Sequence, residues 1–124
     1  MKNIQADIKS GNFKQVYLLY GEEAYLKQQY KQNLVKALNP DGDTMNFNHY
    51  EGKGIDVKQL IDLCETMPFF AERRVVLLED TGFFKNKCEE LADYMKALPD
   101  YLYLVFCESE VDKRSRMYKA VKAC

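Results

Sequence analysis

The stretch MPFFAERRVVLLED, residues 67–80, decides the fold, because it contains the most apolar strand-like run in the chain. Residues 75–78 are a continuous series of valines and leucines, closed by Glu79 and Asp80. A run without polar alternation is typical of a strand buried on both faces, and such strands lie in the middle of parallel sheets. We therefore expect residues 74–79 to form a central strand.

Two adjacent phenylalanines, Phe69 and Phe70, stand directly before this strand. Pro68 lacks a backbone donor and disfavours helical geometry at Met67, so we expect the rings in a turn or short helix at the rim of the sheet. Two interpretations stay open from the residues alone. Either both rings fold under and join the core, or they form an exposed tip that docks on another protein, with residues 72–74 as its polar rim.

Strand and helix signals alternate along the chain on both sides of this stretch. Strands are predicted over residues 15–20, 45–52, 74–79 and 101–107, and helices over residues 2–9, 22–38, 56–64, 88–98 and 112–124. Strict alternation implies right-handed crossovers onto a mostly parallel sheet with helices on both faces, which is a three-layer α/β fold. Polar alternation makes the second strand an edge strand. Because only four strands fit this length, the first strand is expected to be the open edge.

The helix after Asp56 has the clearest pattern. Val57, Leu60, Ile61 and Cys64 recur at helical spacing. Asp56 is the predicted N-cap, with Gln59 three residues later as in a capping box. A last helix is expected to open at Asp112, with Met117, Ala120, Val121 and Cys124 aligned on one face.

The composition describes one ordinary globular domain of 124 residues, 47% apolar and 30% charged. Eighteen basic and nineteen acidic residues give a net charge of -1, so the chain lacks the positive surplus used for direct binding to DNA, RNA or an anionic membrane. No stretch approaches the roughly 18 apolar residues of a membrane span, and residues 1–13 lack the apolar segment of a signal peptide. We expect a cytoplasmic protein with no membrane partner.

The cysteines and the single histidine argue against a metal site. Cys64, Cys88, Cys107 and Cys124 form no C-x-x-C pair. Cys64 and Cys107 fall at apolar positions of predicted elements, where a free thiol acts as a small hydrophobe. His49 lies in the half-exposed second strand, with no Ser, Cys or carboxylate placed by the sequence to work with it. The sequence therefore predicts no metal, no cofactor and no catalytic residue.

The loop after the first strand is where a phosphate-binding loop would lie in such a sheet. The pattern G-x-x-x-x-G-K-[ST] requires a second glycine and a hydroxyl, and this chain has GEEAYLKQ at residues 21–28. Gly21 and Lys27 match, but Leu26 replaces the glycine and Gln28 replaces the hydroxyl. The leucine side chain blocks the close approach of backbone to phosphate, and the two intervening glutamates repel it. These residues predict a degenerate, non-functional phosphate loop.

Four segments together carry a family resemblance: VYLLYGEEAYL, FNHYEG, MPFFAERRVVLLED and LVFCESEVDKRSRMYKAVK. In order and spacing they resemble the N-terminal domain of the delta subunit of the bacterial DNA polymerase III clamp loader. The resemblance spans essentially all of residues 1–124, whereas the family's chains are considerably longer. It implies one domain truncated from a longer chain, with a P-loop NTPase or AAA+ type, RecA-like fold whose nucleotide site is degenerate.

The same resemblance implies a function in DNA replication. A subunit of this family does not hydrolyse ATP; it binds the ring-shaped sliding clamp and helps to open the ring for loading on DNA. The implied partners are the sliding clamp and, through regions largely absent here, other clamp-loader subunits, while DNA is contacted only indirectly. No enzymatic activity and no cofactor are implied.

In that family a hydrophobic pair at a tip inserts into a pocket of the clamp, and the pair aligns with Phe69 and Phe70. The family often has a leucine before the phenylalanine, so Phe69 is a departure that keeps the hydrophobic character. The arginine of the family's segment matches either Arg73 or Arg74. The residues implied to contact the clamp are Met67, Pro68, Phe69, Phe70, Arg73 and Arg74.

Two other classes of function remain as alternatives. A nucleotide-binding P-loop-like NTPase would explain the acidic pair Glu79–Asp80, which closes an apolar strand as a Walker B segment does. A receiver-like or flavodoxin-like signalling module shares the α/β alternation and needs acidic residues after the first and third strands. Residues 21–23 and 79–80 fit that requirement loosely.

Overall fold

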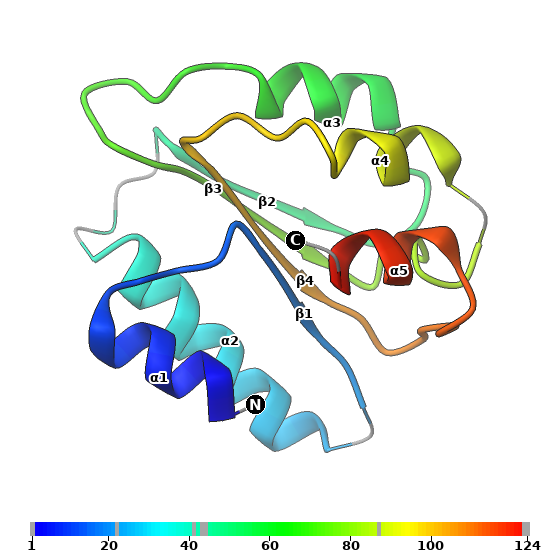
Figure 1. Cartoon of the computed structure of the whole chain (residues 1–124), viewed down its shortest axis with the longest axis horizontal. Helices are drawn as coiled ribbons and strands as arrows, with labels where there is room; N and C mark the ends of the chain where they lie inside the picture. Colours follow the sequence, from blue (N-terminus) through cyan, green and yellow to red (C-terminus); the bar gives the residue numbers. More distant parts are fainter. Residues whose placement is uncertain (1, 22, 41, 43–44, 87, 123–124) are drawn as a thin grey trace.

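The computed structural model describes residues 2–21, 23–40, 42, 45–86 and 88–122 of the chain. Helix and strand alternate through these residues (Figure 1). Their strands are β1 (Val16–Leu19), β2 (Phe47–Glu51), β3 (Arg74–Glu79) and β4 (Leu102–Cys107). Their helices are α1 (Lys2–Ser10), α2 (Ala24–Leu38), α3 (Val57–Cys64), α4 (Glu89–Tyr94) and α5 (Arg116–Lys122).

The described strands form one four-stranded sheet in the order β1-β4-β3-β2. Each neighbouring pair is parallel, so the prediction of a mostly parallel sheet is confirmed. β3 lies between β4 and β2, while β1 and β2 occupy the two edges. Both predicted edges are confirmed among the described residues, since β2, marked by polar alternation, and β1, predicted as the open edge, are the outer strands.

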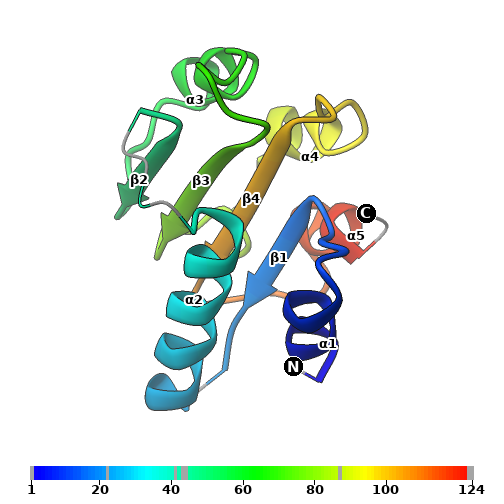
Figure 2. The ribbon, with the colours of Figure 1, turned by 90° about the vertical axis from the view of Figure 1, so that its left-hand side faces the viewer.

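Helices cover both faces of the sheet and complete three layers (Figure 2). α1 and α2 pack on one face through Ile4, Leu34 and Leu38. α3, α4 and α5 pack on the other face, with buried residues that include Leu60 and Leu91. The sheet therefore separates two apolar clusters, one on each side.

β3 supplies side chains to both clusters in turn. Val76 and Leu78 point to the α3–α5 side, and Val75 and Leu77 point to the α1–α2 side. Each of the four is at most 6% exposed. This arrangement confirms the central, doubly buried strand, since a valine or leucine on either face removes apolar surface from water.

The N-terminus of α3 is capped as predicted. Asp56 Oδ1 accepts hydrogen bonds from the backbone N–H groups of Lys58 at 3.0 Å and Gln59 at 3.2 Å. These bonds satisfy two donors that a helix leaves unpaired at its start. The cap matters for the segment that follows, because α3 leads directly to the chain that precedes β3.

The last helix begins later than predicted, at Arg116 rather than Asp112. The Asp112 carboxylate accepts the backbone N–H of Arg114 at 2.9 Å, and its carbonyl accepts that of Ser115 at 3.0 Å, so Asp112 starts a turn. Ser115 Oγ then accepts the N–H of Tyr118 at 3.2 Å and is the true cap. Cys124, predicted to continue the helix, lies outside the described residues.

The helix predicted over residues 88–98 was too long. α4 ends at Tyr94, and the next backbone bonds, from Lys96 to Asp93 and from Ala97 to Tyr94, span three residues. The chain therefore forms a tighter turn before Pro99. The apolar residues Met95 and Leu98 keep their helical spacing through this turn, which is why the sequence predicted a longer helix.

Cys64 and Cys107 are buried free thiols, as the sequence predicts. Burial raises the pKa of the Cys64 thiol to about 12, so it remains protonated as a small core side chain. Among the described helices, none combines the length and apolar character needed to cross a bilayer.

Replacing Asp56 by alanine should lower the free energy of unfolding by about 1 kcal/mol, because two N–H groups of α3 lose their acceptor. Urea unfolding followed by circular dichroism measures the loss. Asp62→Ala, an exposed change within the same helix, is the matched control and should not lower the stability, because alanine has the higher helix propensity. Equal stability of Asp56→Ala and the unmodified chain would contradict the capping assignment.

Candidate functional site

The segment that joins α3 to β3 leads into the amino end of β3 (Figure 1), and it contains Phe69 and Phe70. We call Met67, Phe69 and Phe70 the aromatic tip. Their exposed fractions are 74%, 55% and 93%. The interpretation that both rings join the core is therefore wrong, and the expectation that they are at least partly exposed is confirmed. Exposed phenylalanines side by side form an apolar patch on the surface.

The two rings contact each other at an angle. Their centroids are 4.3 Å apart and the planes cross at 63°, close to an edge-to-face pair. Phe70 has a backbone φ of +55°, the left-handed region that costs a side-chain-bearing residue roughly 1–2 kcal/mol. An exposed ring gains no burial that would offset this cost, so other contacts must hold the segment in its conformation.

Asn46 holds the backbone of Phe69 with both ends of its side-chain amide. Asn46 Oδ1 accepts the N–H of Phe69 at 2.6 Å, and Asn46 Nδ2 donates to the Phe69 carbonyl at 2.8 Å. Asn46 is itself buried, and its carbonyl accepts the N–H of Val75 at 3.0 Å. The amide therefore ties the tip to the start of β3 and restrains the rotation of the Phe69 peptide.

Arg74 holds the other end of the tip. Its guanidinium donates to the carbonyls of Thr66 at 2.7 Å and Met67 at 3.3 Å, and to Asn48 Oδ1 at 3.0 Å. The residue is 5% exposed. The planar fork of arginine suits several acceptors at once, and a cation is favoured near the carbonyls at the end of α3. The tip is thus pre-organised between two buried polar side chains.

Arg73 points to the opposite side of the sheet. Its Nη1 donates to the Leu38 carbonyl at 3.2 Å, and its guanidinium lies 5.0 Å from the ring centroid of Phe13 and 5.5 Å from that of Tyr103. With Phe70 it borders a hollow of about 310 Å³ between the end of α2 and the tip. Of the two candidate arginines, Arg73 lies beside the hollow and Arg74 supports the tip from within.

The sequence analysis missed Asn46 and Asn48. A usable signal was present, because two asparagines alternate on one side of a half-exposed strand that pairs with a strand opening on an arginine. Buried polar groups require partners, and here the partners are main-chain groups of the tip. Only the pairing of β2 with β3 brings them together.

The degenerate phosphate loop lies at the other end of the sheet, after β1. Gly21 has a φ of +121°, and α2 already begins at Ala24. Leu26, Lys27 and Gln28 therefore lie within the helix, where Leu26 is 43% exposed. Glu22 is outside the described residues. A phosphate loop needs several loop residues before its helix, and a helix that begins at Ala24 leaves too few after the end of β1 at Leu19.

Glu79, Asp80 and Glu108 at this carboxyl edge are bonded to groups of the chain itself. Glu79 forms an ion pair with Lys31. Asp80 Oδ1 accepts the N–H and the hydroxyl of Ser109 at 3.1 and 3.0 Å. Glu108, which is buried, accepts hydrogen bonds from Thr81 N, Thr81 Oγ1 and Gly82 N at 3.0–3.1 Å. These bonds join the loops that follow β3 and β4.

The pKa values of two of these carboxyls are shifted in opposite directions. Burial raises the pKa of Glu108 above its ordinary value, although hydrogen bonds from Thr81 and Gly82 partly counteract the effect. Burial acts in the same direction on Glu79, but hydrogen bonds from Lys31 and His49 outweigh it and hold the pKa of Glu79 below its ordinary value. Glu79 is therefore an ionised group at neutral pH.

Comparison with known proteins gives the family. Residues 17–124 match the family model described as DNA polymerase III, delta subunit. The chain belongs to the DNA polymerase III delta-subunit family. A curated relative, DNA polymerase III subunit delta of Bacillus subtilis (strain 168), is 29% identical over 133 residues. That match covers 97% of this chain and 38% of the relative, so the chain spans well under half the length of this delta subunit.

The fold agrees with the family. The chain is similar to the solved structure of the Bacillus subtilis DNA clamp loader delta protein, with a TM-score of 0.82 and 24% identity over 98% of this chain and 39% of that chain. Membership of the delta-subunit family decides against the receiver-like and flavodoxin-like alternatives, which rested on the alternation of strand and helix alone. The resemblance stated from the four sequence segments is confirmed.

Magnesium-ATP should show no saturable binding to this delta-family chain in isothermal titration calorimetry at micromolar concentrations. The reason is that α2 begins too early to leave a phosphate-binding loop after β1. A saturable site with micromolar affinity would contradict this expectation and restore the NTPase alternative.

Replacing Asn46 by alanine should free the tip, because the Phe69 peptide loses both hydrogen bonds. Limited digestion with chymotrypsin, which cleaves after aromatic residues, should then cut after Phe69 and Phe70 faster than at other sites. Asn33→Ala, an exposed change on α2, is the control. Uniform acceleration at every site would mean that Asn46 stabilises the whole fold and not the tip.

Proposed function

We propose that this chain is the N-terminal domain of a clamp-loader delta subunit, which acts in DNA replication by binding the sliding clamp through its aromatic tip. The observation that carries the proposal is the adjacent pair Phe69 and Phe70, exposed on a segment that buried side chains hold in place. Engagement of the clamp near its subunit interface would favour the opened ring and let DNA enter. DNA itself is reached only indirectly.

The energetic source is burial of the two rings in a pocket of the clamp. Complete burial of a phenylalanine contributes about 1.5–3 kcal/mol, so the pair supplies roughly 3–6 kcal/mol before the costs of association. A restrained tip lowers those costs, because less conformational freedom is lost on binding. Two aromatic anchors in one pocket are typical of a binding hot spot.

The surroundings of the rings suit a docking surface. Met67 adds exposed apolar area beside them, and Pro68 restricts the backbone that enters the tip. The exposed Glu72 and the hollow beside Arg73 supply a polar border. In this proposal Arg73 faces the partner, whereas Arg74 acts by positioning the tip.

The proposed subunit is not an enzyme. In an AAA+ type, RecA-like fold its nucleotide site would be degenerate at Leu26 and Gln28, and Glu79, Asp80 and Glu108 at the carboxyl edge already bind groups of the chain. The remaining partners, other clamp-loader subunits, would be met through the parts of the delta subunit that this chain does not span.

Replacing Phe69 and Phe70 together by alanine should weaken binding to the cognate sliding clamp at least about a hundredfold, since the anchors of the hot spot are removed. Surface plasmon resonance on immobilised clamp measures the affinity. The melting temperature should change little, because the rings are exposed in the free chain. Tyr25→Ala removes another exposed aromatic ring, on α2, and is the matched control.

Two results would contradict the proposal. If the double variant unfolds, the rings contribute to the core, where truncation costs about 3–5 kcal/mol for each phenylalanine. If the variant is folded and binds the clamp as the unmodified chain does, the docking surface lies elsewhere.

A further inference from the structure

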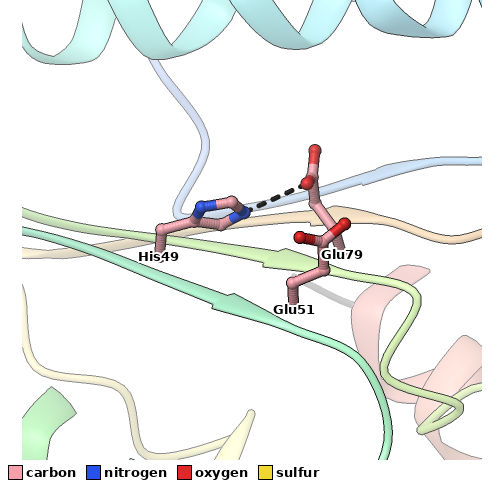
Figure 3. Close-up of side chains that lie close together, drawn as sticks. All are labelled: His49, Glu51 and Glu79. Atoms are coloured by element: carbon pink, nitrogen blue, oxygen red, sulfur yellow. Dashed lines mark hydrogen bonds and ion pairs between the residues drawn. The ribbon is translucent and has the colours of Figure 1, made fainter.

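Three possible metal ligands converge on one edge of the sheet. His49 and Glu51 are two residues apart on β2, so both side chains project from the same face. Glu79 on β3 lies directly beside Glu51 in the parallel register. Figure 3 shows the imidazole and the two carboxylates turned toward one another on the face that α2 covers. The parallel register alone therefore places one nitrogen and two carboxylate ligands together.

The distances are those of a cluster that a small cation can bridge. His49 Nε2 lies 3.0 Å from Glu79 Oε2, and one ligand atom from each of the three residues falls within 4.8 Å of the others. Tetrahedral zinc with bonds of about 2.0–2.1 Å needs neighbouring ligand atoms roughly 3.3 Å apart. Glu51 is exposed, so rotation of its side chain would bring its carboxylate closer to the other two ligand atoms.

Lys31 gives Glu79 the outer contact that ligating carboxylates usually have. Its ammonium group binds Glu79 Oε1, and the side chains of both residues are 13% exposed. The other oxygen, Oε2, faces His49. A carboxylate oriented in this way by a second partner is a better metal ligand, because its rotamer is already selected.

Glu51 lacks such a partner. Among the residues that the structure describes, none donates a hydrogen bond or forms an ion pair with its carboxylate, which is exposed beside that of Glu79. Like charges on adjacent strands repel. A divalent cation between the two carboxylates would turn this repulsion into attraction and would join the edge strand β2 to β3.

We propose that His49 Nε2, Glu51 and Glu79 Oε2 bind one Zn²⁺ ion, with the fourth position open to water. Imidazole nitrogen with carboxylate oxygen suits zinc better than magnesium or calcium, which prefer oxygen ligands only. The site lies at the carboxyl end of the strands, whereas the aromatic tip lies at the amino end. It is therefore separate from the proposed docking surface.

The test is a titration with ZnCl₂ by isothermal titration calorimetry under a phosphine reductant. A background with Cys88→Ser and Cys124→Ser leaves only the buried thiols of Cys64 and Cys107 as competing soft ligands. One equivalent should bind, and His49→Gln or Glu51→Gln should each weaken the affinity at least about tenfold. Glu90→Gln, an exposed change in α4 on the opposite face, should have no effect.

Two further measurements report on the same site. His49 is the only histidine of the chain, so its imidazole gives one set of NMR signals, which should shift and saturate at one equivalent of zinc. Zinc should also raise the melting temperature of the background chain, but not that of Glu51→Gln, because binding stabilises only a fold with an intact site. Absence of zinc binding, or equal affinity in the His49 and Glu51 variants, would overturn the proposal.

Discussion

The buried guanidinium of Arg74 is the contact on which the presentation of the aromatic tip depends. The residue opens β3, so its backbone belongs to the sheet, while its side chain binds the carbonyls of Thr66 and Met67 and the amide of Asn48. One residue thereby connects the end of α3, the tip, β2 and β3. Because a buried charge without partners is costly, the carbonyls and the arginine hold one another in place, and the rings at Phe69 and Phe70 remain outside the core.

The two ends of the parallel sheet serve different purposes in this delta-family chain. At the amino end, the side chains of Asn46 and Arg74 form hydrogen bonds with the backbone of an exposed segment. At the carboxyl end, where ligands gather in many α/β proteins, Glu108 closes the loop after β3 through bonds to Thr81 and Gly82. Side-chain bonds at the carboxyl end thus stabilise the fold, and the aromatic tip lies at the opposite end of the sheet.

Local patterns predicted the elements well where the signal lies within a few residues. The doubly buried strand at Arg74–Glu79 and the Asp56 cap of α3 were both predicted with correct boundaries. The start of the last helix was predicted too early, at Asp112, because the Asp112 carboxylate serves a turn instead. The bond that marks the start, from Tyr118 N–H to Ser115 Oγ, depends on where the chain becomes helical. Helix ends depend on such alternatives more than helix interiors do.

The amino-acid sequence by itself determined the α/β class, the order of elements, the edge and central strands and the family, since each follows from hydrophobic period, turn residues and segment order. Only the tertiary structure decided whether Phe69 and Phe70 are core or surface, and which side chains support them. The reason is that Asn46 and Phe69 are 23 residues apart and meet only when β2 pairs with β3. The same register brings Glu51 beside Glu79. The residue spacing within either strand alone does not predict this contact.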